Sequence, residues 1–256
     1  MEDFRREFPL MFLRTPLIAL ISIALAGLVW QGLVVALHVP HYVIPAPDAI
    51  VAAAISQRHV LLAQAGFTVR ATLIGLVVSL AFALSCAVGF TRSREAERAA
   101  LPLLIAFRSA PVPAIAPIAM LFLGRGIGTS ILVVTIVSFF PLLVNLMRGL
   151  ASVDRNAAEL FHVYGAGFWQ VFGMLRLPTA LPFLFTGLRI AGAAALLGAM
   201  LSEWITGSHG LGNLILESAD MRETELLWAA VLMSVGIAMG LFWLTATGER
   251  IVTRGA

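Results

Sequence analysis

Residues 159–178 read ELFHVYGAGFWQVFGMLRLP, an amphipathic stretch in an otherwise very hydrophobic chain. Glu159 and Arg176 lie near its two ends and glycines interrupt it, so it is too polar and too broken to cross a bilayer as one helix. Large apolar side chains nevertheless recur through it, which is unusual for an exposed loop. They are Leu160, Phe161, Tyr164, Phe168, Trp169, Phe172 and Leu175.

The composition predicts an integral membrane protein. Of the 256 residues, 60% are hydrophobic and 12% are charged, whereas soluble domains are about half apolar and about a quarter charged. All 17 basic residues are arginines that stand between apolar runs, so the net charge of +3 does not indicate nucleic-acid binding. The single cysteine, Cys86, excludes an intrachain disulfide and a cysteine-rich metal site.

Uncharged windows locate the membrane spans. Four are each long enough for a helix across ~30 Å of hydrocarbon. Two further apolar windows carry Arg108, or Arg189 and Glu203. Together they predict an all-α membrane protein in which residues 1–256 form one transmembrane domain. Its six predicted helices are 16–39, 69–91, 99–124, 126–148, 178–204 and 226–248.

The arginines indicate the orientation. Successive spans cross the membrane in opposite directions. One side then holds most of the arginines, and it comprises the N-terminus, the 92–98 loop, residues 148–178 and the C-terminus. The opposite side holds only Arg58, Arg125 and Arg222. The positive-inside rule therefore places both termini, and the stretch 159–178, in the cytoplasm.

No enzyme signature is present in the sequence. A chain without lysine cannot contain the phosphate-binding G-x-x-x-x-G-K-[ST] loop, and no H-E-x-x-H or other metal-ligand cluster occurs. Ser208 and His209 are adjacent, but no G-x-S-x-G motif frames the serine. The sequence predicts no catalytic residues, no bound metal and no cofactor in this chain.

Residues 154–177 have the pattern of two short helices separated by a turn. Asp154 suits a helix N-cap, and Ala157, Leu160, Phe161 and Tyr164 follow at the spacing of one helix face. Gly165-Ala166-Gly167 ends that helix, a second amphipathic piece runs over 168–175, and Pro178 suits the first turn of the next helix.

Two interpretations of these apolar faces compete. An interfacial helix among lipid headgroups suits residues 168–175, where Trp169 is a natural anchor, and both interpretations stay open there. Leu160, Phe161 and Tyr164 adjoin a carboxylate and no lysine or arginine follows until Arg176, whereas an anionic lipid surface attracts segments rich in these residues. A groove on another protein is the favoured neighbour for these three.

The spacing within this stretch resembles the E-A-A…G…I-x-L-P loop of ABC-importer permeases. Glu159, Gly165, Leu177 and Pro178 match that pattern, and Leu175 stands where isoleucine is usual. Leu160-Phe161 replace the two alanines, which implies a roomier groove on the partner. Residues 43–53, 108–128 and GLGNLI at 210–215 are similar to segments of the sulfonate, nitrate and taurine permeases, a subfamily that includes pyrimidine-precursor and riboflavin permeases.

The resemblance implies a type I importer permease of the bacterial inner membrane, working as a homodimer. Residues 154–177, here called the coupling segment, would dock into a cytoplasmic ABC ATPase dimer that binds ATP and magnesium. A solute-binding protein would meet the opposite side. The docking residues implied are Glu159, Leu160, Phe161, Tyr164, Gly165, Leu175, Leu177 and Pro178.

Polar residues within the predicted spans are candidates for the translocation path. Charged groups at membrane depth cost roughly 2.5–3.5 kcal/mol on insertion scales, so each needs a partner or a function. Arg108 precedes prolines that break the helix, and it either faces the path or caps freed carbonyls. Ser138 and Asn145 face the path or bond between helices. The candidates are Arg108, Ser109, Pro111, Pro113, Ser138, Asn145 and Glu203.

A membrane enzyme or a secondary transporter acting without an ATPase is the alternative. An enzyme needs clustered polar groups in the membrane, and a proton-coupled carrier needs several buried carboxylates. Glu203 is the only acidic residue in the predicted spans, which argues against both. The substrate stays open among sulfonates, nitrate, taurine, pyrimidine vitamin precursors and riboflavin.

Overall fold

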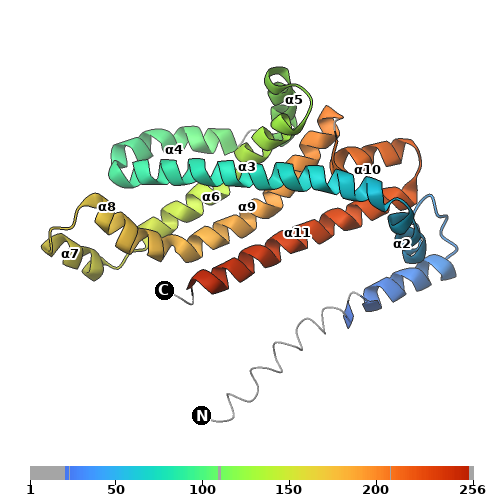
Figure 1. Cartoon of the computed structure of the whole chain (residues 1–256), viewed down its shortest axis with the longest axis horizontal. Helices are drawn as coiled ribbons and strands as arrows, with labels where there is room; N and C mark the ends of the chain where they lie inside the picture. The colour runs from blue at the N-terminus through green and yellow to red at the C-terminus, as the bar shows by residue number, and fades with distance from the viewer. Residues whose placement is uncertain (1–20, 23, 109–110, 208, 254–256) are drawn as a thin grey trace, which may run out of the picture. The chain divides into compact units, whose positions relative to one another are not determined.

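The computed structural model describes residues 21–22, 24–108, 111–207 and 209–253, and over these ranges the regular structure is entirely helical (Figure 1). Contacts divide the chain into two compact units. One holds the described residues up to Arg58 together with Ser218–Ala229. The other holds His59–Glu217 and the described residues from Ala230 onward.

The smaller unit contains an apolar helix, Ala24–Ala36, then α2, Pro47–Ser56, and the beginning of α11, Thr224–Thr253. Its aromatic contact joins Trp30 to Trp228, whose ring centroids are 5.3 Å apart. The predicted span 16–39 lies partly outside the described residues, and the continuous helix described within it is Ala24–Ala36.

From α3 onward, the chain forms the helices that build the larger unit. They are α3 Arg58–Arg92, α4 Arg94–Arg108, α5 Val112–Leu123, α6 Ile127–Ala151, α7 Arg155–Val163, α8 Phe168–Val171, the π-helical turn η1 Phe172–Arg176, α9 Leu177–Thr206 and α10 Leu211–Asp220, followed by most of α11.

The centre of this unit is the pair α6 and α9, which pack along their length. Small residues let the backbones approach, as membrane helices require: a Cβ on Gly149 would overlap Ala180, and one on Gly187 would press on Asn145. The core around them combines α3, α6, η1 and α9. Its buried members are Ala83, Ala87, Leu142, Leu143, Leu146, Leu150, Phe172, Ala180 and Ala191.

Four described helices are long and apolar enough to cross a membrane: α3, α6, α11 and the continuous helix Phe168–Thr206. They correspond to four of the predicted spans. The predicted span 99–124 differs, because α4 ends at Arg108 and α5 begins at Val112 with Pro111 at its N-cap position. The helix break at these prolines is confirmed, while the count of six spans stays a prediction.

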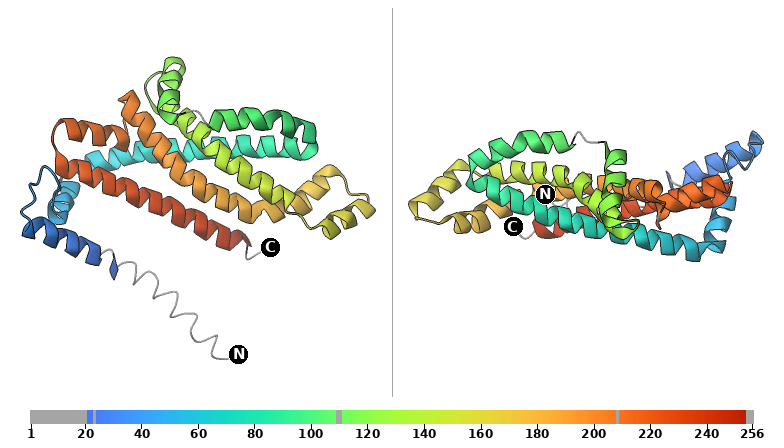
Figure 2. Two further views of the ribbon diagram at one scale, coloured as in Figure 1. Left: turned by 180° about the vertical axis from the view of Figure 1, so that it is seen from behind. Right: turned by 90° about the horizontal axis from the view of Figure 1, so that it is seen from above.

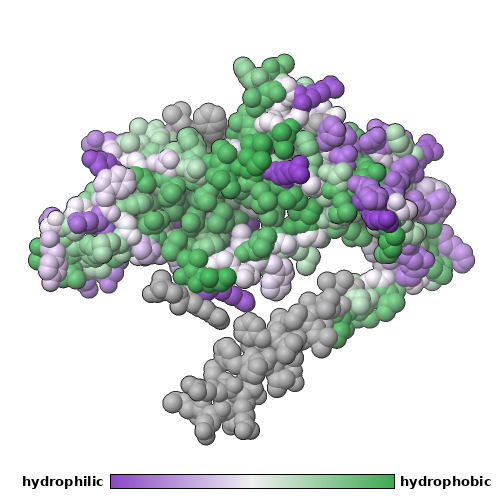
Figure 3. All heavy atoms as spheres, in the orientation of Figure 1, coloured by the Kyte–Doolittle hydropathy of each residue, from purple (hydrophilic) through white to green (hydrophobic). Residues whose placement is uncertain are grey.

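The two halves of this broken segment take different courses. α4 lies beside α3, with Leu104 in the same apolar cluster as Cys86 and Phe90. α5 leaves α4 at a steep angle and packs on α6 through Ala116, Ala119 and Val133 (Figure 2). Hydrophobic side chains cover the middle of the face drawn in Figure 3, as expected for a surface in contact with lipid.

Candidate functional site

α7 is a short helix that is closed at both ends by its own residues. The Asp154 side chain accepts a hydrogen bond of 2.8 Å from the Asn156 amide, so the predicted N-cap is confirmed. At the other end, the amides of Gly165 and Ala166 donate to the carbonyls of His162 and Phe161, each at 3.0 Å. This paired closure needs a left-handed residue, and Gly165 has φ +69°.

The apolar side of α7 is exposed. Leu160 keeps 55% of its surface accessible and Tyr164 keeps 81%, while Phe161 is half-buried. None of the residues of α7 is buried. Glu159 is exposed and pairs with Arg155 on the same helix at 3.0 Å, a weak contact because water screens both groups.

A hollow of about 380 Å³ lies on the coupling segment between α7 and the helix that follows it. Three predicted docking residues, Leu160, Phe161 and Tyr164, form one wall of it. Its remaining lining is Ala166, Gln170 and Met174. The surface presented by the coupling segment is therefore concave as well as apolar.

α8 and η1 attach the coupling segment to the body of the unit. Phe172 is 7% exposed and belongs to the α3–α6–α9 core, and Phe168 stacks on it at 5.9 Å. The Arg92 guanidinium at the end of α3 lies 5.4 Å from the Phe168 ring centroid. Phe168 and Phe172 therefore contact other parts of the protein. Trp169, which lies between them, remains 66% exposed.

The junction between the coupling segment and α9 is a π-helical turn. The Leu177 amide donates to the Phe172 carbonyl, five residues back, and α8, η1 and α9 form one continuous 39-residue helix. Pro178 is thus an early residue of α9 inside this helix, whereas the sequence suggested a fresh start there. Leu175, Leu177 and Pro178 are half-buried, and Thr179 donates to the Leu175 carbonyl at 2.7 Å.

The structure describes only some of the candidate path residues, and those it describes have different surroundings. Ser109 and the Arg108 side chain lie outside the described residues, and Pro111 and Pro113 flank the first residue of α5. Ser138 is completely buried, and its hydroxyl has no partner among the described residues. Asn145 donates to the Pro141 carbonyl at 2.8 Å.

A cavity of about 350 Å³ lies between α5, α6 and α9. Asn145 and Arg148 supply polar side chains to a lining that is otherwise mostly apolar. Arg148 has a guanidinium within reach of this cavity, and the sequence did not single it out for the path. The other lining residues are Val112, Ile115, Ile136, Val137, Phe140, Pro141, Val144 and Ile190.

Glu203 is fully buried in the last turn of α9, so it is not exposed to a vestibule. Its Oε2 accepts a hydrogen bond of 3.0 Å from the Thr68 hydroxyl and one of 2.9 Å from the Gly212 amide. Gln64 and Thr68, which complete this arrangement, were missed from the sequence. Their only local signal is that they are two polar residues four apart in an apolar helix, hence on one face.

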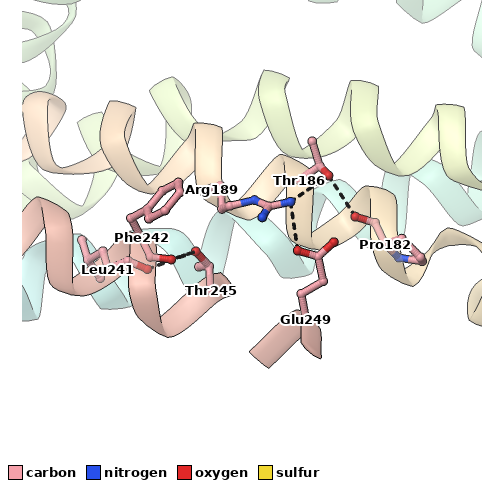
Figure 4. Close-up of polar contacts among 7 residues, drawn as sticks. All are labelled: Pro182, Thr186, Arg189, Leu241, Phe242, Thr245 and Glu249. Atoms are coloured by element: carbon pink, nitrogen blue, oxygen red, sulfur yellow. Dashed lines mark hydrogen bonds and ion pairs between the residues drawn. The ribbon is translucent and has the colours of Figure 1, made fainter. Parts of the chain in front are cut away.

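Arg189 forms an ion pair of 2.9 Å with Glu249, which joins α9 to α11 (Figure 4). The guanidinium also donates to the Thr186 hydroxyl at 3.3 Å. The sequence placed Arg189 in an apolar window and did not identify this partner.

Comparison with known proteins settles the family. Residues 75–252 match the model of the binding-protein-dependent transport system inner membrane component. The chain belongs to this family. The permease is therefore an integral membrane component of a binding-protein-dependent ABC transporter.

The permease is 29% identical over 224 residues to the "Probable ABC transporter permease protein" of Haemophilus influenzae, covering 88% of this chain and 91% of that one. It is 37% identical over 177 residues to the formylaminopyrimidine transport permease protein of Halalkalibacterium halodurans, covering 67% and 69%. Other relatives are named for riboflavin, aliphatic sulfonate and carnitine transport, so the specific subfamily stays a prediction.

The fold matches a chain of the MetNI methionine ABC transporter, solved in inward-facing conformations. The TM-score is 0.70 over 77% of the permease and 98% of that chain, at 16% identity. An identity this low shows the shared fold alone.

Proposed function

We propose that this permease is the membrane-spanning subunit of an ATP-driven importer and that its coupling segment docks on a cytoplasmic ATPase dimer. The observation that carries the proposal is the exposed apolar side of α7, a helix closed at both ends. Large apolar side chains clustered on a surface are typical of a protein interface, because burying them against a partner is favourable.

The attachment of the segment supports its role in transmission. α7 contributes no buried residue, whereas Phe172 anchors the next turn in the core. Beyond the short turn after α7, a force on the coupling segment would reach the rest of α9 through the continuous helix Phe168–Thr206. Closure of the ATPases on ATP would move this rod and change which side of the membrane is open.

In the proposed assembly, two copies of the permease form a homodimer with both termini in the cytoplasm. The ATPase dimer binds ATP and magnesium, and an extracytoplasmic binding protein delivers the solute. The cavity between α5, α6 and α9 is the candidate for the path, with Asn145 and Arg148 as its polar contacts.

Relatives named for formylaminopyrimidine and riboflavin make small nitrogen heterocycles the first substrates to test. Ligand binding to the purified cognate binding protein would identify the substrate directly. Sulfonates, nitrate and taurine belong in the same panel.

The docking surface is tested by replacing two of its exposed side chains together, Leu160→Ala with Tyr164→Ala. We expect affinity for the ATPase subunit to fall at least about tenfold, since exposed aromatic and aliphatic anchors commonly dominate an interface. The measurement is co-purification and titration of the ATPase onto the permease in nanodiscs.

His162→Ala is the matched control, because His162 is exposed on the other side of the same helix. Unchanged ATPase binding in the double variant would remove the docking assignment. Transport in proteoliposomes that persists without ATP would instead support the secondary-transporter alternative.

A further inference from the structure

Three consecutive backbone amides, those of residues 210–212 at the start of α10, donate hydrogen bonds to side chains of other helices. The Gly210 amide donates to Gln64 Oε1 at 2.6 Å, and the Leu211 amide donates to Thr68 Oγ1 at 2.8 Å. The Gly212 amide donates to Glu203 Oε2 at 2.9 Å. The first amides of a helix lack intrahelical acceptors, so α3 and α9 supply the acceptors that this helix start needs.

Glu203 is the centre of this arrangement. Its carboxylate lies at the N-terminal end of α10, where the helix dipole favours a negative charge. The Thr68 hydroxyl donates to the same carboxylate oxygen at 3.0 Å and accepts from Leu211. We call the contacts among Gln64, Thr68, Glu203 and residues 210–212 the outer clasp.

The glycines of the outer clasp fit the carboxylate. Gly210 has φ +122°, a backbone conformation that side chains disfavour, and a Cβ there would collide with the Glu203 carboxyl. A Cβ on Gly212 would collide with the Met200 backbone of α9. The chain can cross the end of α9 this closely only because both positions are glycine.

The clasp does not satisfy the carboxylate completely. Glu203 Oε1 is buried and has no hydrogen-bond partner among the described residues. A half-satisfied buried carboxylate is a poor choice for stability alone, and such groups mark sites with another role.

The position of the clasp indicates that role. It lies at one end of the helix Phe168–Thr206, which spans about 58 Å at 1.5 Å per residue, and the coupling segment lies at the other end (Figure 1). Under the proposed orientation, the clasp is on the side that meets the binding protein.

We propose that Glu203 is a positioning residue that makes the start of α10 move as one body with the ends of α3 and α9. Docking of the binding protein on this side is thereby transmitted along α9 to the ATPases. This inference rests on the proposed function and assigns Glu203 a role in coupling rather than in substrate contact.

The first test uses the permease alone. Thr68→Val keeps the side-chain shape but removes the hydroxyl shared by Glu203 and Leu211, and Glu203→Gln removes the charge. We expect the amides of residues 210–212 to exchange hydrogen at least about tenfold faster in both variants, because each loses an interaction that holds the loop. Unchanged exchange would overturn the clasp.

The second test uses the full complex in nanodiscs. Both variants should keep basal ATP hydrolysis and lose most of the stimulation by loaded binding protein, by about tenfold. Thr72→Val and Glu217→Gln are the matched controls, a buried threonine one turn along α3 and an exposed glutamate in α10. Stimulation equal to the controls, or a parallel loss of basal and stimulated activity, would overturn the coupling role.

The two proposals fail in different ways. If the unmodified permease binds no ATPase, then the proposed function is wrong whatever the variants do. If the unmodified complex is stimulated and the variants are stimulated equally, then only the role of Glu203 is wrong.

Discussion

Arg189 illustrates how a single charge is accommodated in an apolar helix. The guanidinium and the Glu249 carboxylate are 2.9 Å apart, with 28% and 23% of their side chains exposed. Partial burial strengthens such a pair relative to a fully exposed one, and it makes either charge costly once the other is removed. The pair therefore fixes α11 against α9 at this level of the larger unit.

We expect Arg189→Met to destabilise the permease by about 2 kcal/mol, since Glu249 loses the Arg189 guanidinium in a half-buried place. Adding Glu249→Leu should recover most of that loss, because both members of the ion pair are then replaced by apolar side chains. Unfolding in detergent of the two single variants and the double variant completes the cycle. If the double variant is as unstable as the sum of the single variants, then the pair is not coupled.

At the scale of elements, the π-turn η1 sets how the coupling segment leaves α9. Pro178 has no amide hydrogen, so an α-helical bond to the Met174 carbonyl is impossible, and a wider turn accommodates the proline. Phe172 in the same turn is buried in the core. Burying a phenylalanine contributes about 1.5–3 kcal/mol, more than one hydrogen bond at about 1 kcal/mol, so the anchor outweighs the proline.

Pro178→Ala should therefore leave the direction of α7 unchanged, whereas Phe172→Ala should cost about 3 kcal/mol and release it. Spin labels on Val163 and Ser85, both exposed, would report the distance between α7 and α3 in a Cys86→Ser background. A shift as large in Pro178→Ala as in Phe172→Ala would show that the proline sets the direction.

At the scale of the whole molecule, the hydrophobic surface and the distribution of arginines together predict the orientation of the permease in the membrane. α3 exposes Leu73, Ile74, Val77, Val78 and Phe82, which suit lipid or a second copy rather than water. The coupling segment should lie in the cytoplasm and α10 on the opposite side.

Single cysteines at Val163 and Glu217 in the Cys86→Ser background test this arrangement. A membrane-impermeant maleimide applied to intact cells should label position 217 and not position 163, because only the former would face outward. Lysed cells are the control, in which both positions should react. The reverse labelling pattern would invert the proposed topology.

Local patterns in the sequence were sufficient for the apolar helices, for the Asp154 cap, and for the end of α7 before Gly165. Each depends on residues within one or two turns of one another, so composition and periodicity carry the information. The end of α4 and the separate start of α5 were predictable for the same reason, since proline acts on its immediate neighbours.

Tertiary structure alone decided which polar groups meet. Thr68 and Glu203 stand 135 residues apart, and Arg189 finds its partner on another helix, so no local pattern could pair them. The burial of Phe172 likewise depends on a core built by α3, α6 and α9. The sequence by itself predicted a membrane permease with a cytoplasmic coupling segment. Packing determined that Glu203, one of the expected path residues, is buried at the centre of a clasp, because long-range contacts depend on the whole fold.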